Sequence, residues 1–150
     1  EGLFSCHCEE RQRRSNLAAR MDMIQTIPSL CTGCRICEII CSLAHESAIA
    51  PKRSRIRIHS NWPEEEKIFL CLACEPKPCM DACPEGALSW NGCLQIDQEK
   101  CTSCLLCKDA CPYGGIQTEK SKQFPFFCDT CQGEFQCVNW CPTKAVIRVE

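Results

Sequence analysis

The sequence predicts an α+β protein of short strands and short helices, arranged around four groups of cysteines. Three observations lead to this prediction. The chain of 150 residues contains 19 cysteines, a share that indicates a fold held together by something other than a hydrophobic core. Sixteen of the cysteines fall into four quartets of similar spacing. Strand-like and short helical segments flank them, so the chain is a fourfold repeat of strand, cysteine loop and helix.

The third quartet has the most informative spacing. It reads Cys101-Thr-Ser-Cys104-Leu-Leu-Cys107-Lys-Asp-Ala-Cys111-Pro112, which is the C-x2-C-x2-C-x3-C-P run that binds [4Fe–4S] clusters in bacterial ferredoxins. Three cysteines three residues apart let one tight loop reach three iron atoms, while the fourth begins a helix that leads to a different cluster. The run therefore predicts an iron–sulfur site.

Three further quartets repeat this arrangement. The first has Ser42 in place of the proline, and the second and fourth are widened only between their second and third cysteines. Their members are Cys31, Cys34, Cys37 and Cys41; Cys71, Cys74, Cys79 and Cys83; and Cys128, Cys131, Cys137 and Cys141. The quartets are enough for four clusters and leave Cys6, Cys8 and Cys93 as spectators.

Disulfides and zinc are the rival interpretations of so many cysteines. A secreted disulfide scaffold needs an export signal, and Arg20 and Asp22 interrupt any apolar segment after the Arg13-Arg14 pair. Zinc modules normally separate two cysteine pairs by a dozen or more residues, whereas these quartets each span eleven to fourteen residues. The spacing favours iron–sulfur clusters, and folding is then coupled to metal binding.

Charge and hydropathy argue against nucleic acid and the membrane interior as partners. The formal net charge of −2 does not favour nucleic acid, and no apolar run approaches the length of a transmembrane helix. We therefore expect a soluble, cytoplasmic protein without direct membrane insertion. Residues 1–20, which include Cys6, His7 and Cys8, show no hydrophobic period; we expect a disordered tail or sequence upstream of a natural start at Met21 or Met23.

Several local elements can be predicted between the quartets. Strands are expected before the first quartet, at residues 24–28, and after the fourth, at 144–149. A short helix at 38–45 carries Cys41. The basic segment 51–59 ends in an alternating, half-buried strand, whose arginines face either solvent or an anionic partner. His45 and His59 are expected at the surface or in hydrogen bonds.

A β-hairpin is predicted between the second and third quartets. Residues 86–90 and 93–97 form its strands, and Asn91-Gly92 forms a two-residue turn. Cys93 is expected to pack within the second strand. The hairpin joins the second and third quartets as an inner pair. The strands at 24–28 and 144–149 are then free to meet and to close the first and fourth quartets around it.

On these quartets, the chain resembles the four-cluster, ferredoxin-like electron-transfer subunits of molybdenum and tungsten pterin oxidoreductases. The resemblance covers about residues 24–149. Three segments are most similar to the small subunits of tungsten aldehyde oxidoreductases: Cys31-Thr-Gly-Cys34-Arg-Ile-Cys37-Glu, His45-Glu46 and Pro51-Lys-Arg-Ser-Arg-Ile56.

The resemblance implies two bacterial-type 2[4Fe–4S] ferredoxin folds, one nested within the other. Residues 21–70 and 112–150 are its outer half and 71–111 its inner half. The implied ligand sets are Cys31, Cys34, Cys37 and Cys141; Cys128, Cys131, Cys137 and Cys41; Cys71, Cys74, Cys79 and Cys111; and Cys101, Cys104, Cys107 and Cys83.

The expected function is electron transfer without substrate chemistry, since no carboxylate pair, Cys–His dyad or phosphate-binding loop is recognisable. The chain is expected to act as a wire of four [4Fe–4S] clusters. Its ends would face a catalytic pterin-containing subunit and a second redox partner, such as a ferredoxin or a flavin subunit. The alternatives are a free-standing polyferredoxin and a zinc-stabilised interaction module.

Overall fold

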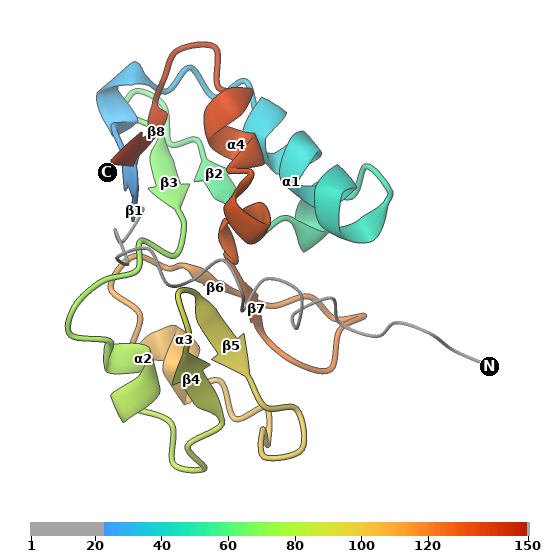
Figure 1. The fold of residues 1–150 in the computed structure, drawn as a ribbon. Coiled ribbons are helices and arrows are strands. Elements are labelled where there is room, and N and C mark those ends of the chain that lie inside the picture. Colours follow the sequence, from blue (N-terminus) through green and yellow to red (C-terminus); the bar gives the residue numbers. More distant parts are fainter. Residues whose placement is uncertain (1–22, 150) are drawn as a thin grey trace.

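The computed structural model describes residues 23–149 (Figure 1). The predictions about the tail at residues 1–20, with Cys6, His7 and Cys8, and about Met21 lie outside the described residues. The described chain mixes short helices and short strands, which confirms the α+β prediction. The helices are α1 (Ile36–Glu46), α2 (Pro78–Asp81), α3 (Leu106–Asp109) and α4 (Gln136–Asn139), with 3-10 turns η1 (Pro28–Leu30), η2 (Pro51–Arg53) and η3 (Thr130–Gly133).

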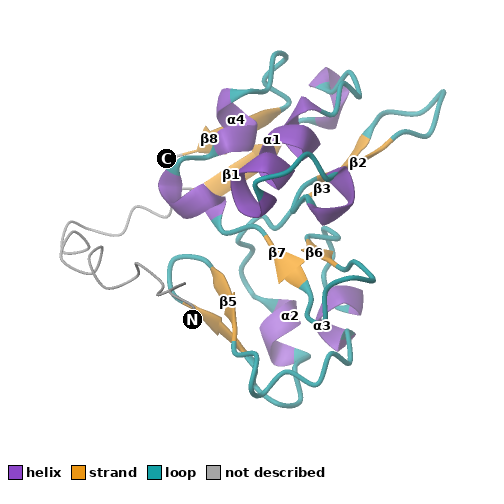
Figure 2. Ribbon diagram, turned by 90° about the vertical axis from the view of Figure 1, so that its right-hand side faces the viewer, coloured by secondary structure: helices purple, strands orange, loops and turns teal. Residues whose placement is uncertain are grey.

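The described strands pair as four two-stranded antiparallel sheets. The pairs are β1 (Met23–Thr26) with β8 (Val146–Val149), β2 (Arg57–His59) with β3 (Lys67–Phe69), β4 (Leu88–Trp90) with β5 (Leu94–Ile96), and β6 (Ile116–Gln117) with β7 (Phe126–Phe127). Figures 1 and 2 show two halves, which we name from Figure 1. The upper half contains α1, α4 and the sheets β1–β8 and β2–β3, and the lower half contains α2, α3, β4–β5 and β6–β7.

The β1–β8 sheet joins the two ends of the described chain. Thr26 lies opposite Val146, and beyond the strand the Ile27 N–H donates to the Ala145 carbonyl at 2.7 Å. The prediction that the strand before the first quartet meets the strand after the fourth is therefore confirmed.

The helices are too short to be stable alone. The longest is α1, with 11 residues, and it includes the helix predicted at 38–45; α2, α3 and α4 have four residues each. Isolated helices of fewer than about 12 residues are marginal in water. None of the described helices has the length and apolar character needed to cross a bilayer.

Each half has a small core in which cysteines stand among apolar side chains. In the upper half the buried residues are Ile24, Ile56, Ile58, Leu70, Phe135 and Val146, with Cys37, Cys41, Cys128 and Cys137. In the lower half they are Leu88, Leu94, Ile116 and Phe127, with Cys79. Thiols therefore occupy positions that aliphatic side chains fill in most proteins.

Glu38 fastens α1 to β2 inside the upper half. Its side chain is buried, and its Oε1 accepts a hydrogen bond from the Ile58 N–H at 2.7 Å. The Arg35 guanidinium lies 3.8 Å from its other carboxylate oxygen. A buried N–H without a partner costs about 1–3 kcal/mol, so this contact holds the helix that carries Cys37 and Cys41 against the strand.

The β4–β5 sheet confirms the predicted hairpin but corrects its turn. Trp90 pairs with Leu94, so the turn contains the three residues between them and not two. Cys93 therefore lies in the turn and not in the strand, and its carbonyl accepts from the Asn91 N–H at 3.1 Å. Gly92 has a φ of 75°, in the left-handed region that glycine adopts without steric cost.

Candidate metal centres

The thiols of the first quartet lie beside the fourth cysteine of the last quartet. Burial raises the pKa of Cys31, and the nearby Cys34 and Cys141 raise it further. Burial also raises the pKa of Cys37 to about 12, with smaller contributions from Glu38, Cys31 and Cys34. We call Cys31, Cys34, Cys37 and Cys141 set A.

The last quartet has Cys41, from the first quartet, as its neighbour. Burial raises the pKa of Cys137 to about 12, and the thiols of Cys131 and Cys41 add to the rise. Burial and then Cys41 raise the pKa of Cys131 to about 11. Cys128 is buried beside Cys137. We call Cys41, Cys128, Cys131 and Cys137 set B.

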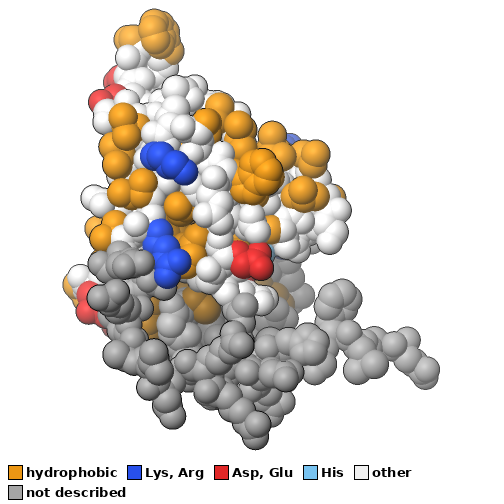
Figure 3. Space-filling model, turned by 45° about the horizontal axis from the view of Figure 1, so that its top comes forward, with side chains coloured by type: hydrophobic (Ala, Val, Ile, Leu, Met, Phe, Trp, Pro, Cys, Tyr) orange, Lys and Arg blue, Asp and Glu red, His pale blue; other side chains and the backbone are white. Residues whose placement is uncertain are grey.

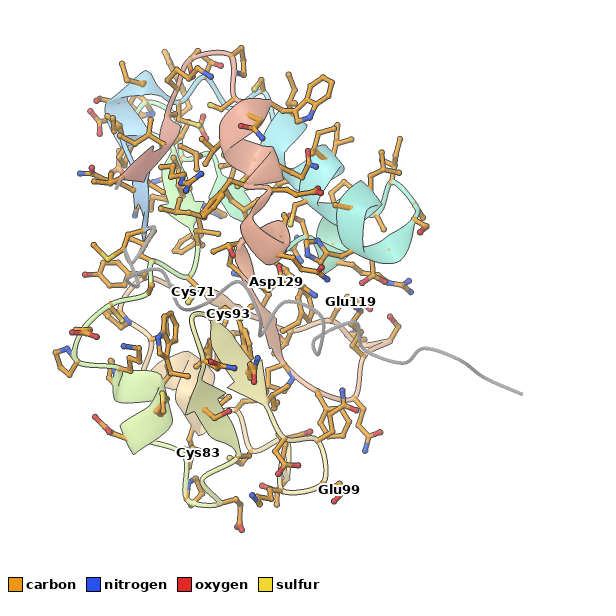
Figure 4. The ribbon with its side chains drawn as sticks, viewed as in Figure 1. Cys71, Cys83, Cys93, Glu99, Glu119 and Asp129 are labelled. Carbon is orange, nitrogen blue, oxygen red and sulfur yellow. The ribbon has the colours of Figure 1, made fainter. Side chains whose placement is uncertain are left out.

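Cys111, the fourth cysteine of the third quartet, lies near the thiols of the second quartet. Burial raises the pKa of Cys79 to about 11, followed by the effects of Cys71, Cys111 and Cys74. We call these four residues set C. Cys93 lies close enough to Cys71 to raise its pKa as well, and Figure 4 shows the two side by side. The predicted spectator thus lies next to a predicted ligand.

The remaining four thiols gather in the lower half. Burial raises the pKa of Cys107, and the nearby Cys83, Cys104 and Cys101 raise it further. These four, set D, line one cavity together with apolar side chains such as Leu88. Each of the four sets therefore combines three thiols of one quartet with the fourth thiol of another.

The sets adjoin one another. Cys137 of set B has Cys37 of set A among its neighbours, and Cys128 of set B has Cys71 of set C. Sets C and D share the core of the lower half, where α2 packs against α3. The thiols thus form a continuous series from A through B and C to D.

Backbone N–H groups point at the fourth cysteines. The Ala87 N–H donates to the Cys83 Sγ and the Gly115 N–H to the Cys111 Sγ, each at 3.3 Å. In both cases the donor lies four residues beyond the cysteine, past a proline. In iron–sulfur proteins, hydrogen bonds to the ligand sulfurs influence the reduction potential.

Ser42 makes the first quartet an exception. Because a proline inside a helix removes a backbone donor, a serine here lets α1 continue through Cys41. The buried Ser42 hydroxyl donates to the Ile39 carbonyl at 2.9 Å and accepts from the Ala50 N–H at 3.1 Å. The Cys41 Sγ instead accepts from the Arg55 N–H at 3.3 Å, a donor much further along the chain.

Left-handed residues begin three of the four helices in the described part of the chain. Arg35, Leu105 and Phe135, at the N-caps of α1, α3 and α4, have φ values of 58°, 64° and 49°. Each lies two residues before the third cysteine of its quartet. Side chains adopt this region at a cost of about 1–3 kcal/mol. Loops that alternate right- and left-handed residues turn successive N–H groups towards an anionic group.

The donor sets fit [4Fe–4S] clusters. Each set supplies four thiols, the number that ligates a cubane. Backbone N–H groups donate to the sulfurs of Cys41, Cys83, Cys111 and Cys128. Concave loops with inward N–H groups are also typical of iron–sulfur sites. Thiolates would hold the iron, and the backbone would balance the negative charge of the sulfur atoms.

A charged network surrounds Cys41. The His45 Nδ1 lies 2.8 Å from the Cys41 carbonyl oxygen and its Nε2 lies 3.0 Å from the Asp129 Oδ1. Burial opposes a charged imidazole, but the bonds to Asp129 and Cys41 raise the pKa of His45 to about 9. Burial likewise raises the pKa of Cys41, but the hydrogen bonds from His45 and Arg55 outweigh it and lower that pKa.

Two arginines of the basic segment form ion pairs within the chain. Arg55 forms an ion pair with Asp129 at 2.5 Å, and Arg53 lies 3.5 Å from Glu46 and 3.8 Å from Glu119. Both therefore have acidic partners inside the protein, although the side chain of Arg53 is 41% exposed. The prediction of a hydrogen-bonded role is confirmed for His45. The spacing of the cysteines gave no sign of Asp129, because its partners come from the other end of the chain.

Gly115 provides a test of set C. A Cβ at this position would lie 2.4 Å from the Cys71 backbone nitrogen, so Gly115→Ala must push Cys71 away from Cys111. We expect loss of about four irons per chain and a destabilisation of about 1–3 kcal/mol or more, measured by iron analysis and thermal melting. Gly86→Ala is the control: its φ of 56° makes the substitution strained, but nothing lies within 4 Å of the new Cβ, so it should cost stability without displacing a cysteine. Equal iron loss in both variants would contradict the prediction.

Comparison with known proteins agrees with this geometry. Residues 28–44, with the first quartet, and residues 94–117, with the third, each match a model described as a 4Fe–4S binding domain. The fold and these matches define the class of the molecule: it is an iron–sulfur protein of the ferredoxin type.

Relatives then identify the family. The chain is 39% identical over 117 residues to the "aliphatic sulfonate oxidoreductase, polyferredoxin-like subunit" of Pyrococcus furiosus, a match that covers 76% of this chain and 68% of the relative. It is 31% identical over 147 residues to the electron transport protein HydN of Escherichia coli, covering 81% and 84%. The chain belongs to this family of polyferredoxin-like 4Fe–4S electron-transfer proteins.

A solved structure has a similar fold. One chain of the "active site complex BamBC of benzoyl coenzyme A reductase in complex with benzoyl-CoA" matches with a TM-score of 0.51 and 26% identity. The match covers 85% of this chain and 78% of that one.

Proposed function

We propose that the protein carries electrons through four [4Fe–4S] clusters between two other redox proteins. One partner is a catalytic subunit with a tungsten or molybdenum pterin, of the tungsten aldehyde oxidoreductase type, and the other is a ferredoxin or a flavin subunit. The observation that carries the proposal is the series of adjoining thiol sets. A relative and a structural neighbour that are themselves parts of oxidoreductases support the catalytic partner.

Each set holds one cluster in this proposal. Set A is Cys31, Cys34, Cys37 and Cys141; set B is Cys128, Cys131, Cys137 and Cys41; set C is Cys71, Cys74, Cys79 and Cys111; and set D is Cys101, Cys104, Cys107 and Cys83. A cytoplasmic location is consistent with so many reduced thiols, since that compartment keeps cysteines reduced.

The proposed architecture is a ferredoxin-type fold nested within another. Residues 71–111 form the inner half and residues 21–70 and 112–150 the outer half. Three contacts support it: β1 pairs with β8, α1 packs against α4, and α2 packs against α3. Ile116 and Phe127 belong to the outer half but pack in the core of the lower half beside Cys79. This packing connects the outer half to the inner half.

The protein's own part in electron transfer is to hold and space the clusters. When bound, a [4Fe–4S] cluster accepts and returns one electron at a time. The exchange of fourth cysteines keeps sets A and B together and sets C and D together. The closeness of Cys37 to Cys137, and of Cys71 to Cys128, extends the path through the whole molecule.

The upper end of the molecule suits a protein partner. Leu30 and Trp140 directly precede Cys31 and Cys141 of set A, and their side chains are 44% and 57% exposed. Figure 3 shows apolar side chains over much of this face and few charged ones. Exposed apolar surface of this kind is typical of protein–protein contacts, and a partner seated there would lie next to set A.

Cluster content tests the proposal. With four irons and four sulfides per set, anaerobically purified protein is expected to contain about sixteen of each per chain. It should absorb broadly in the blue and bleach with dithionite. Iron near eight or twelve per chain would contradict four clusters, and a colourless protein containing zinc would instead make it a zinc-stabilised module.

Size-exclusion chromatography of a native extract distinguishes the subunit from a free carrier. Co-elution with a large pterin-containing protein is the expected result. Elution at the size of the chain alone would favour the free-standing polyferredoxin.

A further inference from the structure

Set B differs from set A in the charged side chains around it, which are those of Asp129, Arg55 and His45. Asp129, labelled in Figure 4, lies where the two halves meet. Its Oδ2 pairs with the Arg55 guanidinium at 2.5 Å, and its Oδ1 accepts from the Cys131 N–H at 3.0 Å and lies 3.0 Å from the His45 Nε2. Arg55 itself donates its backbone N–H to the Cys41 Sγ.

These contacts clamp cysteines from two quartets into one site. Arg55 and His45 contact Cys41, which comes from the first quartet, and Asp129 contacts Cys131, which comes from the fourth. The serine after Cys41 explains the need for them. Because α1 continues past Cys41, the amide four residues on stays in the helix, and Arg55 takes over as the donor to the sulfur.

Carboxylates act on the thiols of set A. Glu66 lies close to Cys31 and Glu38 close to Cys37, although Glu38 is itself paired with Arg35. Near set B the Asp129 carboxylate and the Arg55 guanidinium, a permanent cation, act on Cys131 in opposite directions. A nearby positive charge favours the reduced, more negative state of a cluster, and a nearby negative charge disfavours it.

We propose that Arg55, held in place by Asp129 and His45, raises the reduction potential of the cluster at set B. The inference rests on the proposed four-cluster function. Arg55 is a positioning and tuning residue: its amide orients the Cys41 sulfur and its guanidinium supplies the charge.

A redox titration of the holoprotein, followed by electron paramagnetic resonance, tests the proposal. Arg55→Met removes the charge but keeps the backbone N–H. One of the four clusters should shift to lower potential by about tenfold in its one-electron equilibrium, or about 59 mV. Arg55→Lys, which keeps the charge, should restore most of the shift. Arg53→Met is the matched control, because its ion pairs are with Glu46 and Glu119, and it should move no cluster.

Asp129→Asn separates an electrostatic role from a structural one. Asparagine can still accept from the Cys131 N–H but leaves the cation of Arg55 uncompensated. The same cluster should therefore shift to higher potential when the titration is run at a pH low enough to keep His45 protonated, because Asp129 also raises the pKa of His45. Shifts in the same direction for Arg55→Met and Asp129→Asn would overturn the proposal, as would an unchanged potential in both. If Arg55→Met does not load iron, the other two variants decide: the proposal requires a higher potential in Asp129→Asn and a nearly unchanged potential in Arg55→Lys. Fewer than sixteen irons in the unaltered protein would instead count against the four clusters.

Discussion

Removal of iron is expected to unfold the protein. The cores are small, and cysteines fill positions among their apolar side chains. Helices α2, α3 and α4 have four residues each, far too few for independent stability. Without iron the buried thiols would leave unfilled space and strained, left-handed loops with nothing to bind. Metal-binding free energy is then largely folding free energy.

An anaerobic treatment with an iron chelator under mild acid provides the measurement. We expect loss of the cooperative thermal transition and of most near-ultraviolet circular dichroism, together with the visible colour. Rebuilding the clusters with iron and sulfide should restore all three signals. A metal-free protein that melts cooperatively near the original temperature would show that apolar packing alone stabilises the fold.

Exchange of the fourth cysteines predicts a second large effect. Cys141→Ala should open the cluster site of the first quartet and leave the fourth quartet, to which Cys141 belongs in sequence, with all its ligands. The reason is that Cys141 lies beside Cys31, whereas Cys41 lies beside Cys131. About four of sixteen irons should be lost.

Thiol alkylation and peptide mass spectrometry locate the damage. In the Cys141→Ala protein, labelling should rise at Cys31, Cys34 and Cys37 and stay low at Cys128 and the other thiols of set B. Cys41→Ala should give the converse pattern, and Cys93→Ser should leave the iron content unchanged. If Cys141→Ala instead exposes the thiols of the third quartet, the chain has a tandem arrangement and the proposed ligand sets are wrong.

Local patterns in the sequence accounted for much of the fold. The cysteine spacings located the loops, the apolar segment 24–28 predicted β1, and alternation around Asn91-Gly92 predicted the β4–β5 hairpin. The turn was mispredicted by one residue, because Asn-Gly usually forms two-residue turns and the sequence does not show that Cys93 joins it. These features depend on residues that are neighbours in the chain.

The charged network around Cys41 could not be predicted from local sequence patterns. His45 and Asp129 are 84 residues apart, and nothing in the pattern around either one specifies the other. The serine after Cys41 is visible in the sequence as a departure from the repeat of the quartets. Its actual consequence, a longer helix and a distant sulfur donor, depends on the three-dimensional path of residues 47–55.

Pairing of β1 with β8 determines the order in which parts of the chain can fold during synthesis. A ribosome makes Met23–Thr26 long before Val146–Val149, so the first strand emerges without its partner. Closing so long a loop is slow compared with forming the local β4–β5 hairpin. The segment between the second and third quartets can therefore fold while translation continues, whereas the sheet around the first quartet closes only when the last strand leaves the ribosome. Chains released before residue 146 would expose the unpaired edge of β1, a feature that promotes aggregation.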